Sequence, residues 1–507
     1  MSVRLRVAVT IFVAMLVLSG GTAPASAAGP TILGAGSTWS QIAIDQWRYD
    51  VVRLGLAVNY SGVGSTQGRS FFAQGSVDFG VSEIPYGEGG EPLPSRAFKY
   101  LPIVAGGTSL MYNLTSVSGQ QIKGLQLSPE TIEGIFTGQI TNWNDPRIKK
   151  DSHLVLPNKQ ITIVVRADGS GTSYQFSAFL KATDPGAWGS FAGRCGIANA
   201  PTSFYPPDCL HNEIAQNRSD GVANYIANPG LGSGSIGYVE AGYAIARKFP
   251  VVAVQNKSGH YAYPTAHSVA TALQHAQINP TDSTQELSGV YNAPEANAYP
   301  ISSYSYMIVP TDSSISTDKG AVLGKFIIYF ACTGQQEAES LGYSPMPKEL
   351  VGFAFDAEKQ IPGAPNPPAL TGSACPNPTL TGSFYNEHND GPPPGSVTTP
   401  DQGGNPSGTE TPGTSTDQGG TGSGASSGPP SSVGPSTGAS SSGGSGPSES
   451  VAPETLGDKG LLRAQALTAD KVGGMKMAAA WPLIAAAIIV LLLIFGPLLM
   501  RVRSRTR

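Results

Sequence analysis

Residues 391–450 constrain the fold of this chain most, because they contain no aromatic residue and no Leu, Ile, Met, Lys or Arg. They consist almost entirely of Gly, Ser, Pro and Thr. Such a stretch cannot bury enough apolar surface to offset the entropy lost when its backbone is ordered. We therefore expect residues 377–474 to form a disordered linker, and the compact fold to be built from the residues before it.

The N-terminus has the pattern of a secretory signal peptide. Arg4 and Arg6 precede an apolar run over residues 7–18, and the small-residue sequence Ala25-Ser26-Ala27 follows. This apolar run is too short for a lasting membrane span, and the small residues fit a cleavage site. The sequence thus predicts a signal peptide over residues 1–28; a buried N-terminal helix is the alternative.

The C-terminus predicts a membrane anchor. Residues 477–500 contain no charged residue, and as a helix they would cross a hydrocarbon core of ~30 Å. Four arginines lie in the tail at residues 501–507, and positive flanks stay in the cytoplasm. We expect a single-pass protein of the cell membrane with its body outside and its C-terminus inside. A cell-wall sorting signal fits less well, because residues 452–456 lack its leading Leu and closing Gly.

Four cysteines suit an oxidising exterior. Pairing by proximity joins Cys195 to Cys209 and Cys332 to Cys375, and it is the simplest of three possible connectivities. Metal binding is the weaker alternative, because no C-x-x-C spacing or His partner accompanies these residues.

Residues 29–376 alternate short apolar strands with helical patterns, which favours an α/β fold with largely parallel sheets. Strands are predicted over residues 54–60 and 161–165, each followed by a helix. Ser128-Pro129-Glu130 predicts a helix start, since it combines a capping Ser, a first-turn Pro and an acid near the positive end of the helix dipole.

Three predicted junctions between a strand and a helix share small residues and hydroxyls. They are residues 34–39 (GAGSTW), 62–66 (GVGST) and 168–172 (DGSGT). Helix N-termini offer unpaired N–H groups and partial positive charge, which suit an oxyanion, and Arg166 could add a charge-assisted pair of hydrogen bonds. Ordinary helix capping is the alternative for any one junction, but three in one chain favour an anion site.

Other functions have little support in the sequence. There is no P-loop motif, and the G-x-G-x-x-G match at residues 232–237 lies between a predicted helix and a strand, the reverse of the dinucleotide fingerprint. A net charge of −4 gives no reason to expect a nucleic-acid partner. Without H-E-x-x-H or a paired nucleophile and base, we expect neither an enzyme nor a cofactor.

The chain resembles the phosphate-binding receptors of bacterial phosphate ABC transporters. The likeness follows the family's order from about residue 33 to residue 347, and the segment RADGSGT at residues 166–172 is its most specific part. The other segments are GAGSTW (34–39), VDFGVSE (77–83), LPIVAG (101–106), ITNWNDP (140–146), GSIGYVE (234–240) and LGY (341–343).

The resemblance implies a two-lobed periplasmic-binding-protein fold of type II that closes around one phosphate like a flytrap. Lobe I would comprise residues 29–112 and 302–376, and lobe II residues 113–301. The crossing strands would act as a hinge near residues 112–113 and 301–304.

The resemblance also implies a ligand set. Thr38 would give a hydroxyl, Thr38 and Trp39 backbone N–H groups, and Ser65 a second hydroxyl. The other lobe would contribute Arg166, with Asp168 as the acid that supports this arginine. The start of the following helix would contribute Ser170, Gly171 and Thr172.

Glu83 departs from the family pattern, which has Asp at this position. The carboxylate would accept a hydrogen bond from a proton on phosphate, whereas sulfate, which lacks that proton, would be repelled. The Glu side chain is one methylene longer and places its carboxylate about 1 Å further out. The resemblance therefore predicts the selectivity for phosphate less firmly than it predicts the fold. A solvated loop acid is the alternative for Glu83.

Together these features predict a membrane-tethered receptor that delivers inorganic phosphate to the permease subunits of an ABC transporter. Two other functions remain open: a surface phosphatase or phosphoester-binding enzyme, and a sensor or adhesive surface protein that keeps the binding fold.

Overall fold

The computed structural model describes residues 29–88, 91–205, 209–210, 212–381 and 384. The predicted signal peptide, the predicted membrane segment at 477–500, the basic tail and all but the start of the predicted linker lie outside these residues. Within the described residues, no helix combines the length and the apolar character that a membrane crossing requires.

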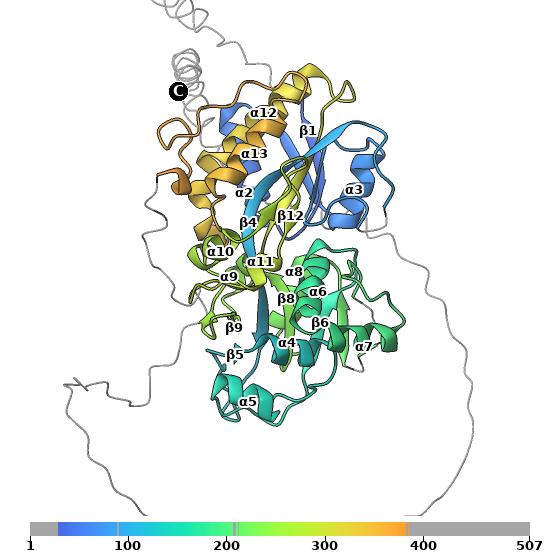
Figure 1. Ribbon diagram of the computed structural model, residues 1–507, viewed down its shortest axis with the longest axis vertical. Coiled ribbons are helices and arrows are strands. Elements are labelled where there is room, and N and C mark those ends of the chain that lie inside the picture. Colours follow the sequence, from blue (N-terminus) through green and yellow to red (C-terminus); the bar gives the residue numbers. More distant parts are fainter. Residues whose placement is uncertain (1–28, 89–90, 206–208, 211, 382–383, 385–507) are drawn as a thin grey trace, which may run out of the picture. The chain divides into compact units, whose positions relative to one another are not determined.

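An eight-stranded mixed sheet forms the framework, in the order β2-β1-β3-β13-β4-β8-β6-β7 (Figure 1). Its strands are β1 (Ile32–Gly36), β2 (Val58–Gly62), β3 (Phe79–Ser82), β4 (Phe98–Asn113), β6 (Thr162–Arg166), β7 (Glu213–Gln216), β8 (Ser235–Glu240) and β13 (Ser302–Pro310).

The strand directions divide this sheet into two groups. β1 is parallel to β2 and β3, and β6 is parallel to β7 and β8. The central strands β13 and β4 are antiparallel to each other and to their outer neighbours β3 and β8. The prediction of largely parallel sheets therefore holds for the outer strands and is wrong at the centre, where the long β4 connects the two groups.

β4 changes partner midway along its length. Gly107 is the last β4 residue paired with β13, opposite Ser302, and Thr108 is the first paired with β8, opposite Glu240. We call the group β1, β2, β3, β13 and the first part of β4 lobe I, and the group β6, β7, β8 and the second part of β4 lobe II (Figure 1). The change of partner in β4 lies before residues 112–113, where the sequence predicted one hinge strand. β13 begins within residues 301–304, the predicted position of the other hinge strand.

Helices pack on the strands of both groups. In lobe I, α3 packs on β1 and β3, and α12 and α13 pack on β4; in lobe II, α8 packs on β6 and β8, and α9 on β4. The α-helices are α2 (Gln41–Asp50), α3 (Ser65–Ala73), α4 (Pro129–Phe136), α5 (Pro146–Ser152), α6 (Gly171–Thr183), α7 (Pro185–Cys195), α8 (Arg218–Ala227), α9 (Ala241–Arg247), α10 (Ala266–Leu273), α11 (Ser288–Tyr291), α12 (Thr317–Ala331) and α13 (Lys348–Glu358).

The remaining elements are short. The 3-10 helices are η1 (Val51–Leu54), η2 (Thr333–Glu337), η3 (Glu339–Leu341) and η4 (Pro378–Leu380), and the minor strands are β5 (Gln126–Leu127), β9 (Ala253–Gln255), β10 (Tyr261–Ala262), β11 (Gln277–Ile278) and β12 (Gln285–Glu286).

Local signals predicted several elements. Ser128 caps α4, accepting a hydrogen bond from the Thr131 N–H, as its sequence indicates. The strand predicted to begin at Leu54 begins instead at Val58, because α2 runs on into η1 and Gly55 ends that turn. The apolar Leu54 and Leu56 thus belong to a helix end and a loop, not to the strand.

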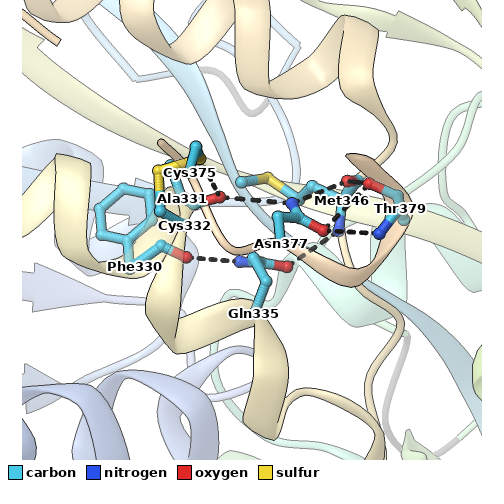
Figure 2. The surroundings of a disulfide bond; sticks show 8 residues. All are labelled: Phe330, Ala331, Cys332, Gln335, Met346, Cys375, Asn377 and Thr379. Atoms are coloured by element: carbon cyan, nitrogen blue, oxygen red, sulfur yellow. Dashed lines mark hydrogen bonds between the residues drawn. A yellow bond between two sulfur atoms is a disulfide. The ribbon is translucent and has the colours of Figure 1, made fainter. Parts of the chain in front are cut away.

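Both predicted disulfides are present, Cys195–Cys209 and Cys332–Cys375. The second joins the end of α12 to residues 375–381, here called the C-terminal segment (Figure 2). The fully buried Asn377 side chain donates to the carbonyls of Ala331 and Met346. Ordered packing therefore continues past residue 376, the predicted end of lobe I.

Candidate functional site

The three junctions singled out from the sequence meet between the two lobes. The Thr66 N–H donates to the Gly169 carbonyl at 3.2 Å, and the Gly171 N–H donates to Ser65 Oγ at 3.1 Å. Gly64, at φ +92°, allows this approach, since a Cβ there would lie 2.4 Å from Asp168 Oδ2. The start of α3 in lobe I thus faces the start of α6 in lobe II.

Glu83 lies directly after β3, and its carboxylate is buried within this meeting point. Oε1 accepts hydrogen bonds from Ser305 Oγ at 2.6 Å and from the Ser37 hydroxyl, and Oε2 accepts one from Ser65 Oγ at 2.7 Å. A Cβ on Gly171 would lie 2.1 Å from Oε2, so the carboxylate reaches the first residue of α6. Glu83 is 1% exposed and is therefore not a solvated loop acid.

Arg166 ends β6 and is 3% exposed. Its Nε donates to Asp168 Oδ1 at 2.8 Å, Nη2 donates to Asp168 Oδ2, and Nη1 donates to Ser219 Oγ at 3.3 Å. Burial alone would raise the pKa of Asp168, but hydrogen bonds from Arg166, its charge and the Arg218 N–H outweigh burial and lower that pKa. Asp168 therefore stays ionised and fixes the plane of the guanidinium.

The first junction contributes Thr38 and Trp39. Thr38 Oγ1 lies 2.9 Å from Ser219 Oγ and accepts a hydrogen bond from the Ser219 N–H at 3.1 Å. The Trp39 ring packs edge-on against Tyr343 and donates to Thr108 Oγ1. Trp39 can therefore serve the site through its backbone and not through its side chain.

The start of α6 contains the remaining predicted residues. Ser170 caps this helix by accepting a hydrogen bond from the Ser173 N–H. Thr172 is 2% exposed, and its hydroxyl has no hydrogen-bond partner among the residues that the structure describes. A buried hydroxyl without a partner beside a helix N-terminus suits an anionic ligand, because such a group costs stability unless a ligand satisfies it.

Sequence reasoning missed three hydroxyls of this arrangement, those of Ser37, Ser219 and Ser305. Ser37 lies within the first junction but was not predicted as a ligand. Ser219 is the second residue of α8, and Asn217 before this helix is a typical N-cap residue, so the sequence could have indicated a fourth helix start. Ser305 lies inside β13, and no local pattern marks it.

The site thus combines hydroxyls and backbone N–H groups with one guanidinium and one carboxylate, nearly all excluded from water. Such a set can bind an oxyanion through many donors, while its one acceptor can take a hydrogen bond from a protonated oxygen of that anion. Within the described ranges, no cluster of three or more His, Cys, Asp or Glu residues could hold a metal ion.

Comparison with known proteins gives a family match over most of the folded part. Residues 21–333 match the model of a PBP superfamily domain. The chain is 30% identical to the phosphate-binding protein PstS of Xylella fastidiosa (strain Temecula1) over 323 residues, 63% of this chain and 82% of the relative. It is 32% identical to the phosphate-binding protein PstS of Pasteurella multocida over 250 residues, 49% of this chain and 67% of the relative.

A solved structure titled as a DING protein is 20% identical, with a TM-score of 0.49, and the match covers 63% of this chain and 92% of that one.

Proposed function

The chain belongs to the PBP superfamily, and from this premise we propose that it is an extracytoplasmic receptor that binds inorganic phosphate for an ABC transporter. One observation carries the proposal: junctions distant in sequence converge on a buried set of donors. These donors include Arg166 and a Thr172 hydroxyl that has no partner among the residues the structure describes. The relatives named as phosphate-binding proteins support phosphate as the ligand.

In this function Arg166 neutralises part of the phosphate charge while its bond to Asp168 holds it in place. The hydroxyls and N–H groups donate to the phosphate oxygens, and exclusion of water strengthens each bond. The proposed ligands are Thr38, Trp39 (through its N–H), Ser65, Arg166, Ser170, Gly171 and Thr172.

Glu83 provides selectivity. Its carboxylate accepts a hydrogen bond from a protonated phosphate oxygen and repels sulfate. Its contacts with Ser37, Ser65 and Ser305 show that the longer Glu side chain reaches the converging junctions. The hydroxyl of Ser65 would then turn from Glu83 to the anion.

Phosphate release and capture would use β4 and β13 as the strands that cross between the lobes. In the proposed division, lobe I comprises residues 29–112 and 302–376, and lobe II residues 113–301. The partner change at Gly107–Thr108 favours a hinge at that point of β4. Residues 385–474 would tether the receptor to a membrane helix at 477–500, after removal of residues 1–28. A tethered receptor stays near its permease at high effective concentration.

A phosphatase is the less favoured function, because the relatives carry the names of binding proteins. Hydrolysis of a phosphoester by the wild-type protein would reverse this preference.

Calorimetric titration of the full-length protein, stripped of bound anion, tests the proposal. We expect tight phosphate binding that weakens about 100-fold or more in Arg166→Ala, because charge-assisted hydrogen bonds are lost. Arg147→Ala is the matched control, since Arg147 pairs with Asp145 on an exposed helix start. Absence of phosphate binding by the wild-type protein, or equal affinity in both variants, would contradict the proposal.

A further inference from the structure

Three consecutive backbone carbonyls of the first junction each accept a hydrogen bond from a tyrosine hydroxyl. The Tyr60 hydroxyl donates to the Ser37 carbonyl at 2.7 Å, the Tyr243 hydroxyl to the Thr38 carbonyl, and the Tyr343 hydroxyl to the Trp39 carbonyl at 2.6 Å. The three tyrosines come from β2, from α9 and from the segment after η3.

All three tyrosines are nearly excluded from water, at 7%, 5% and 1% exposure for Tyr60, Tyr243 and Tyr343. Burial, followed by nearby ionisable groups such as Glu83, raises the pKa of Tyr60 well above 10. Burial likewise raises the pKa of Tyr243 and Tyr343. These hydroxyls therefore remain protonated donors at neutral pH.

The consequence for the anion site follows from peptide geometry. In a trans peptide the carbonyl and the next residue's N–H point in opposite directions. Holding the carbonyls of Ser37, Thr38 and Trp39 toward the tyrosines therefore turns the N–H groups of Thr38, Trp39 and Ser40 the other way. The Trp39 N–H donates there to Ser37 Oγ at 3.0 Å, and it would exchange that acceptor for the anion. It also keeps the negative ends of the carbonyl dipoles away from an incoming anion. The Thr38 carbonyl also accepts a hydrogen bond from the Gln41 N–H at 3.4 Å.

Tyr243 differs from the other two because it belongs to the opposite lobe. It lies in α9 and packs in the lobe II core with Met111, Val164 and Val239. Its hydroxyl nevertheless reaches Thr38, which precedes α2 in lobe I. This bond therefore joins the two lobes.

We propose that Tyr60, Tyr243 and Tyr343 are positioning residues that orient the first junction for anion binding, and that Tyr243 also couples this orientation to lobe closure. The proposal rests on the proposed phosphate function. Tyr60 and Tyr343 preorganise the loop within lobe I, whereas Tyr243 completes it on closure and so slows anion release.

Tyrosine-to-phenylalanine variants remove one hydroxyl each and test the proposal. Phosphate affinity and binding kinetics are measured on the full-length protein by calorimetry and stopped flow. We expect each of Tyr60→Phe, Tyr243→Phe and Tyr343→Phe to bind phosphate about tenfold more weakly, the effect of one lost hydrogen bond. For Tyr243→Phe the change should lie in a faster koff with kon unchanged.

Tyr205→Phe is the matched control. Tyr205 is buried to the same degree, and its hydroxyl also donates to a backbone carbonyl, that of Phe136, away from the first junction. It should lose thermal stability as the other variants do and keep the wild-type Kd. Wild-type phosphate affinity in all three test variants would overturn the proposal while leaving the phosphate function intact. A wild-type protein that binds no phosphate would overturn both.

Discussion

At the residue scale, a positive and a negative side chain serve one buried site in different ways. Arg166 is held by Asp168 and in the proposed site supplies charge, whereas Glu83 is held by serine hydroxyls and would supply an acceptor. The helix-start motifs indicated Arg166, because glycines, hydroxyls and an arginine at helix starts have a direct chemical meaning, and the resemblance to the family indicated Glu83. They could not indicate Ser305, because its contact with Glu83 depends on the pairing of β13 with β3.

Replacing Glu83 with Gln should reduce the discrimination between phosphate and sulfate. The amide is nearly the same size but lacks the charge that repels a fully deprotonated oxyanion. We expect the ratio of the two affinities, measured by calorimetry at neutral pH, to fall at least about tenfold, mainly because sulfate binds more tightly. An unchanged ratio would show that Glu83 does not set selectivity.

Replacing Thr172 with Val should weaken phosphate binding without reducing stability. The hydroxyl has no partner among the described residues, so the folded protein loses no hydrogen bond when a methyl group replaces it. We expect phosphate affinity to fall about tenfold, while the free energy of unfolding of the ligand-free protein stays the same or rises. Wild-type affinity in this variant would remove Thr172 from the ligand set.

At the element scale, helix starts were predictable and sheet pairing was not. Ser128 before Pro129 specifies the start of α4 through local hydrogen bonding. The antiparallel centre of the sheet depends instead on contact between β4 and β13, which lie far apart in the sequence. Local patterns contain no information on that contact, so the sequence favoured largely parallel sheets.

α4 also predicts a pH dependence of stability. Burial of Glu133, with the charges of Asp184 and Glu130, raises its pKa from 4.5 to about 8. Between these values the folded state binds more protons than the unfolded state, so Glu133 lowers stability as pH rises through this window. Glu133→Gln should match the wild-type stability near pH 4 and exceed it by about 1–3 kcal/mol at pH 8 or above.

Denaturant unfolding at several pH values measures this difference. Glu349→Gln is the matched control, since Glu349 is an exposed glutamate in the first turn of a different helix, α13. If the free energy of unfolding of Glu133→Gln does not rise relative to the wild type between pH 5 and pH 8, the raised pKa of Glu133 is contradicted.

At the scale of the whole molecule, the two lobes are joined by β4, and the C-terminal segment is fixed to lobe I by Cys332–Cys375. The resemblance predicted two lobes, because several motifs keep the family's order. It placed the hinge at residues 112–113 and not at the change of partner at Gly107–Thr108, where the small and polar residues 106–109 (GGTS) interrupt the apolar residues of β4.

The two disulfides should contribute unequally to stability. Cys332–Cys375 spans 43 residues and Cys195–Cys209 spans 14, and the chain-entropy model gives about 4 and about 3 kcal/mol, respectively. Paired Cys-to-Ser variants, compared by denaturant unfolding, should therefore lose more stability when the longer loop is opened. A larger loss from the Cys195–Cys209 pair would contradict this ranking.

The central claim is that the converging junctions enclose one phosphate, and the crystal structure of the protein grown with phosphate tests it most directly. We predict one phosphate between the lobes, within hydrogen-bond distance of Arg166, of the N-terminus of α6 and of Thr38, with a Glu83 oxygen facing a protonated phosphate oxygen. A phosphate bound elsewhere, with Arg166 still contacting only Asp168 and Ser219, would contradict the account.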